Sequence, residues 1–70
     1  MKSKFNIEIE VLEYALRYVQ KEGYLNIKHT IEDLEDFAYN MCEGNDWHVK
    51  VKIYYWAIEE GFNKSWLLKS

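Results

Sequence analysis

The side chains that could do covalent or acid–base chemistry in this chain are one cysteine, two histidines and a run of acids. Cys42 would need His29 or His48 as a base, yet neither histidine stands beside a recognisable orienting carboxylate. Cys42 also falls near the end of a predicted helix, where the helix dipole disfavours a reactive thiolate. We therefore expect Cys42 to be structural, and the sequence predicts no catalytic residue.

Metal and cofactor chemistry have no better support in the sequence. Cys42 and His48 would need two more donors, and their spacing matches no zinc-binding pattern. The three glycines stand singly, so there is no glycine-rich loop to hold a phosphate. The acids of residues 30–37 are expected on a solvated helix face, which offers no pocket for acid–base work. We expect no metal, no cofactor and no enzymatic activity.

Composition limits the remaining functions. The chain has 70 residues, which is enough for one small domain, and 17% of them are aromatic. A net charge of −3 argues against bulk electrostatic attraction to nucleic acid. Acids interrupt the apolar residues near the N-terminus, and no apolar run is long enough to cross a membrane. Together with the single cysteine, these features predict a cytoplasmic protein.

Periodicity and capping signals predict two helices before residue 45. A first helix is expected over Ile9–Glu22, with Gly23 after its end. A second is expected between a Thr30 cap and Gly44, because acids crowd its first turn. The apolar stripe of the first helix consists of Phe5, Ile9, Leu12, Leu16 and Val19. The predicted buried face of the second consists of Ile31, Leu34, Phe37, Ala38 and Met41.

Residues 49–56, VKVKIYYW, are ambiguous. They alternate as a strand would, but a cap at Asn45 or Asp46 and Gly61 beyond the end favour a third helix. As a helix, the segment is apolar on two opposite sides. One side carries Trp47, Val51, Tyr54 and Ile58, and the other carries Val49, Ile53 and Trp56. We ask which of the two sides the rest of the chain covers.

The predicted fold is an all-α, three-helix bundle formed by one domain, residues 1–70. A short fourth helical turn is expected to start at Asn63 or Ser65 and to contain Trp66, Leu67 and Leu68. The alternative is a β-α-α-β unit, in which residues 4–11 and 48–56 pair as two strands. A two-stranded sheet is marginally stable, and this alternative would shorten the first helix, so the helical fold is favoured.

Binding of another protein is the function that these exclusions leave. One candidate surface is the aromatic side of the third helix, formed by Val49, Ile53 and Trp56, joined by Tyr55 or Trp66. The other is the acidic face of the second helix, formed by Glu32, Asp33, Glu35, Asp36 and Tyr39. Packing within the chain and plain solvation are the competing explanations of the two patterns.

We expect a non-catalytic regulator or inhibitor, and a composition rich in Lys, Ile, Asn and Tyr suits a phage or mobile-element gene. The surplus of apolar surface would also suit a homodimer. The alternative is a DNA-binding helix-turn-helix regulator presenting His48, Lys50 and Lys52. Its turn departs from the usual pattern, and the acids of the preceding helix would repel phosphate.

Overall fold

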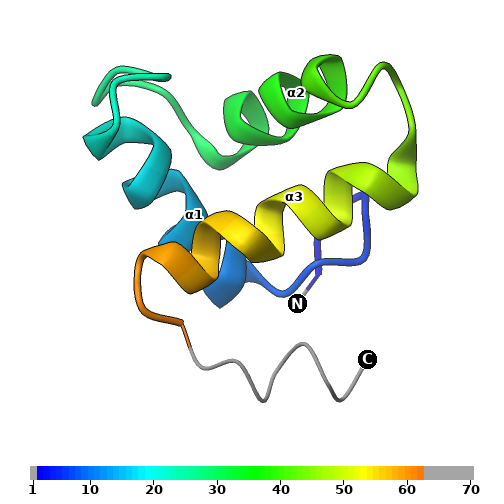
Figure 1. The fold of residues 1–70 in the computed structure, drawn as a ribbon, viewed down its shortest axis with the longest axis horizontal. Coiled ribbons are helices and arrows are strands. Elements are labelled where there is room, and N and C mark those ends of the chain that lie inside the picture. The colour runs from blue at the N-terminus through cyan, green and yellow to red at the C-terminus, as the bar shows by residue number, and fades with distance from the viewer. Residues whose placement is uncertain (1, 63–70) are drawn as a thin grey trace.

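The computed structural model describes residues 2–62 and confirms the all-α fold (Figure 1). Its three helices are α1 (Ile9–Lys21), α2 (Ile31–Met41) and α3 (Asp46–Glu59). Within the described residues the one extended pairing is an isolated antiparallel bridge between Lys2 and Glu8. Residues 48–56 lie inside α3, so the β-α-α-β alternative is wrong. The predicted fourth turn lies outside the described residues.

Local side-chain chemistry sets where α2 and α3 begin. The hydroxyl of Thr30 accepts a hydrogen bond from the Asp33 backbone N–H, and the Asp33 carboxylate accepts one from the Thr30 N–H. This capping box satisfies two backbone donors at once. At the start of α3, Asn45 Oδ1 accepts from the His48 N–H at 3.2 Å, so Asn45 is the cap rather than Asp46.

A tight turn joins α2 to α3. Glu43 and Gly44 both have left-handed backbones, with φ of 55° and 77°. The Gly44 N–H donates to the Tyr39 carbonyl at 3.0 Å, which closes the end of α2. A Cβ on Gly44 would lie 3.2 Å from the Tyr39 hydroxyl oxygen, so a larger residue there would press on that ring.

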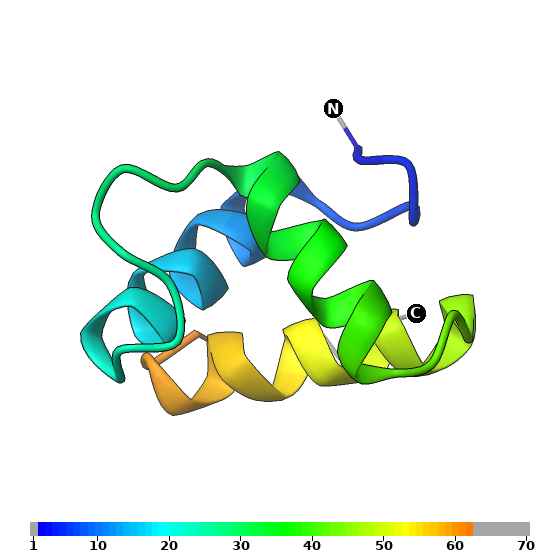
Figure 2. The same cartoon turned by 90° about the horizontal axis from the view of Figure 1, so that it is seen from above.

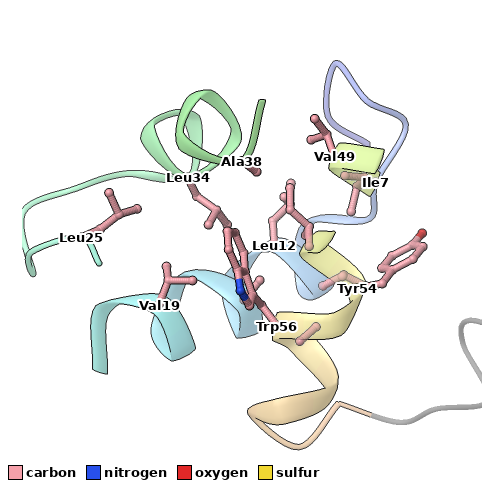
Figure 3. Packing of buried hydrophobic residues seen from close by; sticks show 13 residues of the cluster. Ile7, Leu12, Val19, Leu25, Leu34, Ala38, Val49, Tyr54 and Trp56 are labelled. Carbon is pink, nitrogen blue, oxygen red and sulfur yellow. The ribbon is translucent and has the colours of Figure 1, made fainter. Parts of the chain in front are cut away.

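The core lies where α3 packs against α1, with α2 across both helices (Figure 2). Trp56 of α3 occupies its centre, beside Leu34 of α2 and Val19 of α1 (Figure 3). The Trp56 ring also stacks on Phe37, with centroids 5.8 Å apart. The buried apolar residues are Ile7, Val11, Leu12, Ala15, Val19, Leu25, Leu34, Ala38, Val49, Ile53, Tyr54, Trp56 and Ala57.

Two details of the predicted helix faces are wrong. The fully buried side of α1 centres on Val11, Leu12, Ala15 and Val19, whereas Ile9 and Leu16 are half-buried at its edge. The core-facing arc of α1 is therefore rotated from the predicted stripe towards Val11 and Ala15, and α1 packs most extensively against α3. Met41, assigned to the buried face of α2, is half exposed in the last turn.

The segment before α1 completes the core. Ile7 is fully buried, and its carbonyl accepts a hydrogen bond from the Ser3 N–H. The Ser3 hydroxyl oxygen in turn accepts from the backbone N–H groups of Phe5 and Ile7. Asn6 adopts a left-handed backbone that turns the chain towards α1. This N-terminal segment, residues 2–8, runs beside the end of α2 (Figure 2).

Ile53→Ala and Val51→Ala form a matched pair that tests which side of α3 faces the core. Ile53 is fully buried, so its truncation should destabilise the fold by about 2–5 kcal/mol, whereas the cost at Val51 should stay near 0.5 kcal/mol. Urea unfolding followed by circular dichroism measures both values. Equal losses for the two variants would contradict the assigned orientation of α3.

The capping box predicts how stability depends on pH. Hydrogen bonds from the Thr30 backbone and hydroxyl lower the pKa of Asp33 below its ordinary value of 3.8. Its contribution to stability is therefore present above the ordinary pKa and is lost as the pH falls through the folded-state pKa. Asp33→Asn should remove that part of the acid dependence of the urea midpoint. An unchanged acid profile in this variant would contradict the assignment.

Candidate functional site

The side of α3 proposed for binding from the sequence is the side that the chain buries. Val49 and Ile53 are fully buried, and Trp56 is 8% exposed. These three residues face α1 and α2, so the chain's own helices cover them. As part of the core they present no surface to a partner in this fold, and the expectation of an exposed Val49–Ile53–Trp56 face is corrected. Trp66 lies outside the described residues.

The opposite side of α3 carries the exposed aromatic residues. Trp47, Val51 and Tyr55 are 68%, 36% and 64% exposed. They stand four residues apart, so at 3.6 residues per turn they follow one another along one side of α3. We call this set the apolar stripe. Tyr55 was a candidate binding residue from the sequence, whereas Trp47 and Val51 were placed on the side opposite the candidate surface of Val49, Ile53 and Trp56.

The surroundings of the apolar stripe come from α1 and from the end of α3. Ile58 continues the stripe and is half-buried. Beyond it, the Phe62 ring packs edge-on against Tyr14 of α1, with centroids 5.0 Å apart. Asp46 precedes Trp47 at one end, and Glu59 stands one turn beyond Tyr55 at the other. The stripe is therefore an apolar surface with Glu59 near one end and with Lys50 and Lys52 on its two sides.

The predicted acidic face of α2 is divided among different tasks. Asp33 belongs to the capping box, and Asp36 Oδ1 lies 3.0 Å from Lys4 Nζ. The hydrogen bond and the charge of Asp36 raise the pKa of Lys4, against a lowering by desolvation. Tyr39 stacks on Phe5, with centroids 6.0 Å apart. The N-terminal segment thus covers part of this face. Within residues 2–62, Glu32 is the one acid of the set that is exposed and neither caps the helix nor forms an ion pair.

Glu35 is the acid that sequence patterning misplaced. It is 5% exposed, and within the described residues its Oε2 is buried without a hydrogen-bond partner. A buried carboxylate with an unmade hydrogen bond costs free energy. Lys4 is close enough for the charge of Glu35 to act on it, but it pairs with Asp36 instead. Helical spacing does mark this position, because Glu35 lies four residues after Ile31 and three before Ala38, both on the predicted buried face.

The residues considered for catalysis are not assembled into a site. The Nδ1 atom of His29 accepts a hydrogen bond from the Asn26 backbone N–H at 2.9 Å, which holds the loop between α1 and α2. His48 is exposed in the first turn of α3, and Cys42 is half-buried after the end of α2. Among residues 2–62, no three His, Cys, Asp or Glu side chains are grouped as metal ligands would be.

The basic residues of α3 do not form one face for a DNA groove. Lys50 and Lys52 are about 200° apart around the helix axis, and only Lys52 lies on the His48 flank. Lys50 lies instead over the ring of Tyr54, with its Nζ 5.8 Å from the centroid.

Within the described part of the chain, no helix is both long and apolar enough to span a membrane.

Replacing Glu35 should raise the stability of the fold. Glu35→Met removes a buried oxygen that lacks a hydrogen bond and keeps a similar volume, so we expect a gain of about 1 kcal/mol. Glu32→Met, three residues earlier on the exposed surface, is the matched control and should change little. Urea midpoints measure both. Destabilisation by Glu35→Met would mean that its carboxylate makes a favourable contact in solution.

Comparisons with known proteins place no further constraint on this surface. The chain matches no protein-family model, no curated protein and no solved structure. A functional conclusion therefore rests on the residues and their geometry: an exposed apolar stripe on α3, and an acidic face on α2 that the N-terminal segment partly covers.

Proposed function

We propose that this protein is a non-catalytic regulator or inhibitor that binds another protein, with the apolar stripe of α3 as its main contact. The observation that carries the proposal is the exposure of Trp47 and Tyr55 on one side of a helix whose other side is the core. Tryptophan and tyrosine are the residues most often found to dominate binding energy at protein interfaces.

The size of the apolar stripe supports a small contact. Aromatic side chains bury roughly 150–250 Å² each when fully covered. At the exposures of Trp47, Val51 and Tyr55, the stripe offers about 300–400 Å² of apolar surface. A patch of that size is near the largest on a typical monomer, and such patches are often functional. A stripe of this size suits binding of α3 in a groove of the partner, or one hot spot within a wider interface.

The acidic face of α2 supports a secondary role in the same proposal. Glu32 is exposed, and Asp36 pairs with Lys4 at a site where both side chains remain more than half exposed. Exposed ion pairs contribute about 0–1 kcal/mol, so a basic partner could replace Lys4 at little cost. Such charges affect the association rate and the choice of partner more than the affinity.

The alternative of a DNA-binding regulator receives less support. A helix that binds in a DNA groove needs its basic side chains on one side, but Lys50 and Lys52 are on different sides of α3. The aromatic residues of the stripe would then have no role. We therefore keep protein binding as the single proposed function.

Site-specific photo-cross-linking tests the proposal. Tyr55 is replaced with p-benzoylphenylalanine, and Tyr24, with a similar exposure of 58% in the loop before α2, is replaced in the matched control. In an extract of the native host, the probe at position 55 should give a discrete cross-linked product that position 24 does not give. Adding Trp47→Ala should weaken capture by about thirtyfold, the effect of losing a hot spot worth roughly 2 kcal/mol.

Two results would contradict the proposed surface. One is equal cross-linking from positions 24 and 55, which would indicate non-specific contact. The other is a product at position 55 that Trp47→Ala leaves unchanged while circular dichroism shows an intact fold.

A further inference from the structure

The charged residues beside the apolar stripe indicate the chemistry of the partner. We propose that the stripe binds an amphipathic helix of another protein, whose apolar ridge carries acidic side chains on both flanks. This inference rests on the proposed function for its surface, and it adds the class of partner.

Lys50 and Lys52 border the middle of the apolar stripe on its two sides. Each is next to Val51 in the sequence and therefore lies about 100° from it around the helix axis, in opposite directions. Both lysines are half-buried, which is typical of side chains whose aliphatic stems lie against the fold. The Lys50 ammonium is also held over the ring of Tyr54. The stripe is thus an apolar ridge between two positive charges.

Neither of these lysines has a carboxylate partner among the described residues. The ion pairs within residues 2–62 involve other lysines, namely Lys2, Lys4 and Lys21. Glu59 lies on the same flank as Lys52, but it is seven residues further on, about 10 Å along the axis. A partner carboxylate could therefore pair with Lys50 and another with Lys52 without displacing an existing ion pair.

A helix is the partner element that fits this pattern. Trp47, Val51 and Tyr55 form a ridge about 12 Å long at 1.5 Å per residue. Two packed helices have their axes about 8–10 Å apart, so side chains that flank the contact on one helix reach those that flank it on the other. Acidic residues at those flanking positions would meet Lys50 and Lys52. Such pairs determine the choice and register of the partner more than the affinity.

The net charge of the chain does not oppose this local pairing. The chain carries −3, which repels an acidic partner at long range. At physiological ionic strength, however, exposed charges more than about 8 Å apart are largely screened. The charges that act at the middle of the stripe are therefore those of Lys50 and Lys52.

A second copy of the chain and an anionic membrane fit the stripe less well. A symmetric contact between two copies centred on Val51 would place Lys50 and Lys52 opposite the same lysines of the other copy. Like charges facing each other disfavour that contact. A helix that lies in a membrane surface inserts a broad apolar face, whereas the side of α3 opposite the stripe is the protein core.

Two synthetic helical peptides of about 18 residues, or five turns, test the proposal. They share one leucine ridge, and its two flanks carry glutamate in one peptide and lysine in the other. We expect the glutamate peptide to bind the full chain about tenfold more tightly at low salt, and high salt should reduce the difference. Fluorescence anisotropy of the labelled peptides measures both affinities, and NMR shifts at Val51 and Tyr55 locate the contact.

Charge reversal in the protein provides matched variants. Lys50→Glu with Lys52→Glu should reverse the preference between the two peptides. Lys2→Glu with Lys28→Glu changes the net charge equally but lies outside α3, so it should preserve the preference. Circular dichroism checks the fold of both variants.

Three results would overturn the inference. Equal affinities for the two peptides, or a preference that persists in Lys50→Glu with Lys52→Glu, would leave the stripe to another class of protein and the proposed function intact. Binding to phosphatidylserine vesicles but to neither peptide would assign the stripe to a membrane. Conversely, a glutamate preference without a cross-linked product at position 55 would support the inferred chemistry and contradict the proposed function in that host.

Discussion

The structure depends on one packing constraint, which is that α3 is apolar on two sides while α1 and α2 can cover only one of them. The chain buries the side with Val49, Ile53 and Trp56. The Trp56 ring stacks on Phe37 of α2 and belongs to the same buried cluster as Val19 of α1. A helix that is apolar on two sides needs neighbours on both to remove all of its apolar surface from water. The exposure of Trp47 and Tyr55 follows directly, because a bundle this small has no fourth described helix to place there.

The small size of the chain also explains why the acidic face of α2 is less available to a partner than its sequence indicates. Three of its four acids already have structural surroundings: Asp33 caps the helix, Asp36 pairs with Lys4, and Glu35 is buried. The N-terminal segment that supplies Lys4 also stacks Phe5 on Tyr39 and inserts Ile7 into the core. The apolar stripe is therefore the larger surface left without a partner among the described residues, and our proposal for a protein partner concerns it.

The features that the sequence predicted well are local ones. Thr30 as a cap, Gly61 after α3 and the start of α1 at Ile9 depend on neighbouring residues and on backbone geometry. The starts of α2 and α3 therefore followed from short patterns, whereas α1 begins after Glu8 without a side-chain capping hydrogen bond. The binding role of the candidate residues remains a prediction.

The inward side of α3 was not predictable in the same way, because it depends on where α1 and α2 lie. Both sides carry a tryptophan and β-branched residues or tyrosines, so hydrophobicity alone does not separate them. One available signal was Ala57 beside the Val49 side, since a small residue permits close helix contact, and it is nearly fully buried. The burial of Glu35 had a positional signal, since it lies at helical spacing from Ile31 and Ala38, but its charge indicated solvent exposure.

The most direct test of the central claim compares two isoleucine methyl groups. Ile53 is fully buried on the inward side of α3, whereas Ile27, in the loop between α1 and α2, is 88% exposed. In the presence of a soluble gadolinium chelate, the account predicts strong relaxation of the Ile27 methyls and almost none at Ile53. Relaxation of Ile53 comparable to that of Ile27 would contradict the account, because the Val49–Ile53–Trp56 side would then face solvent.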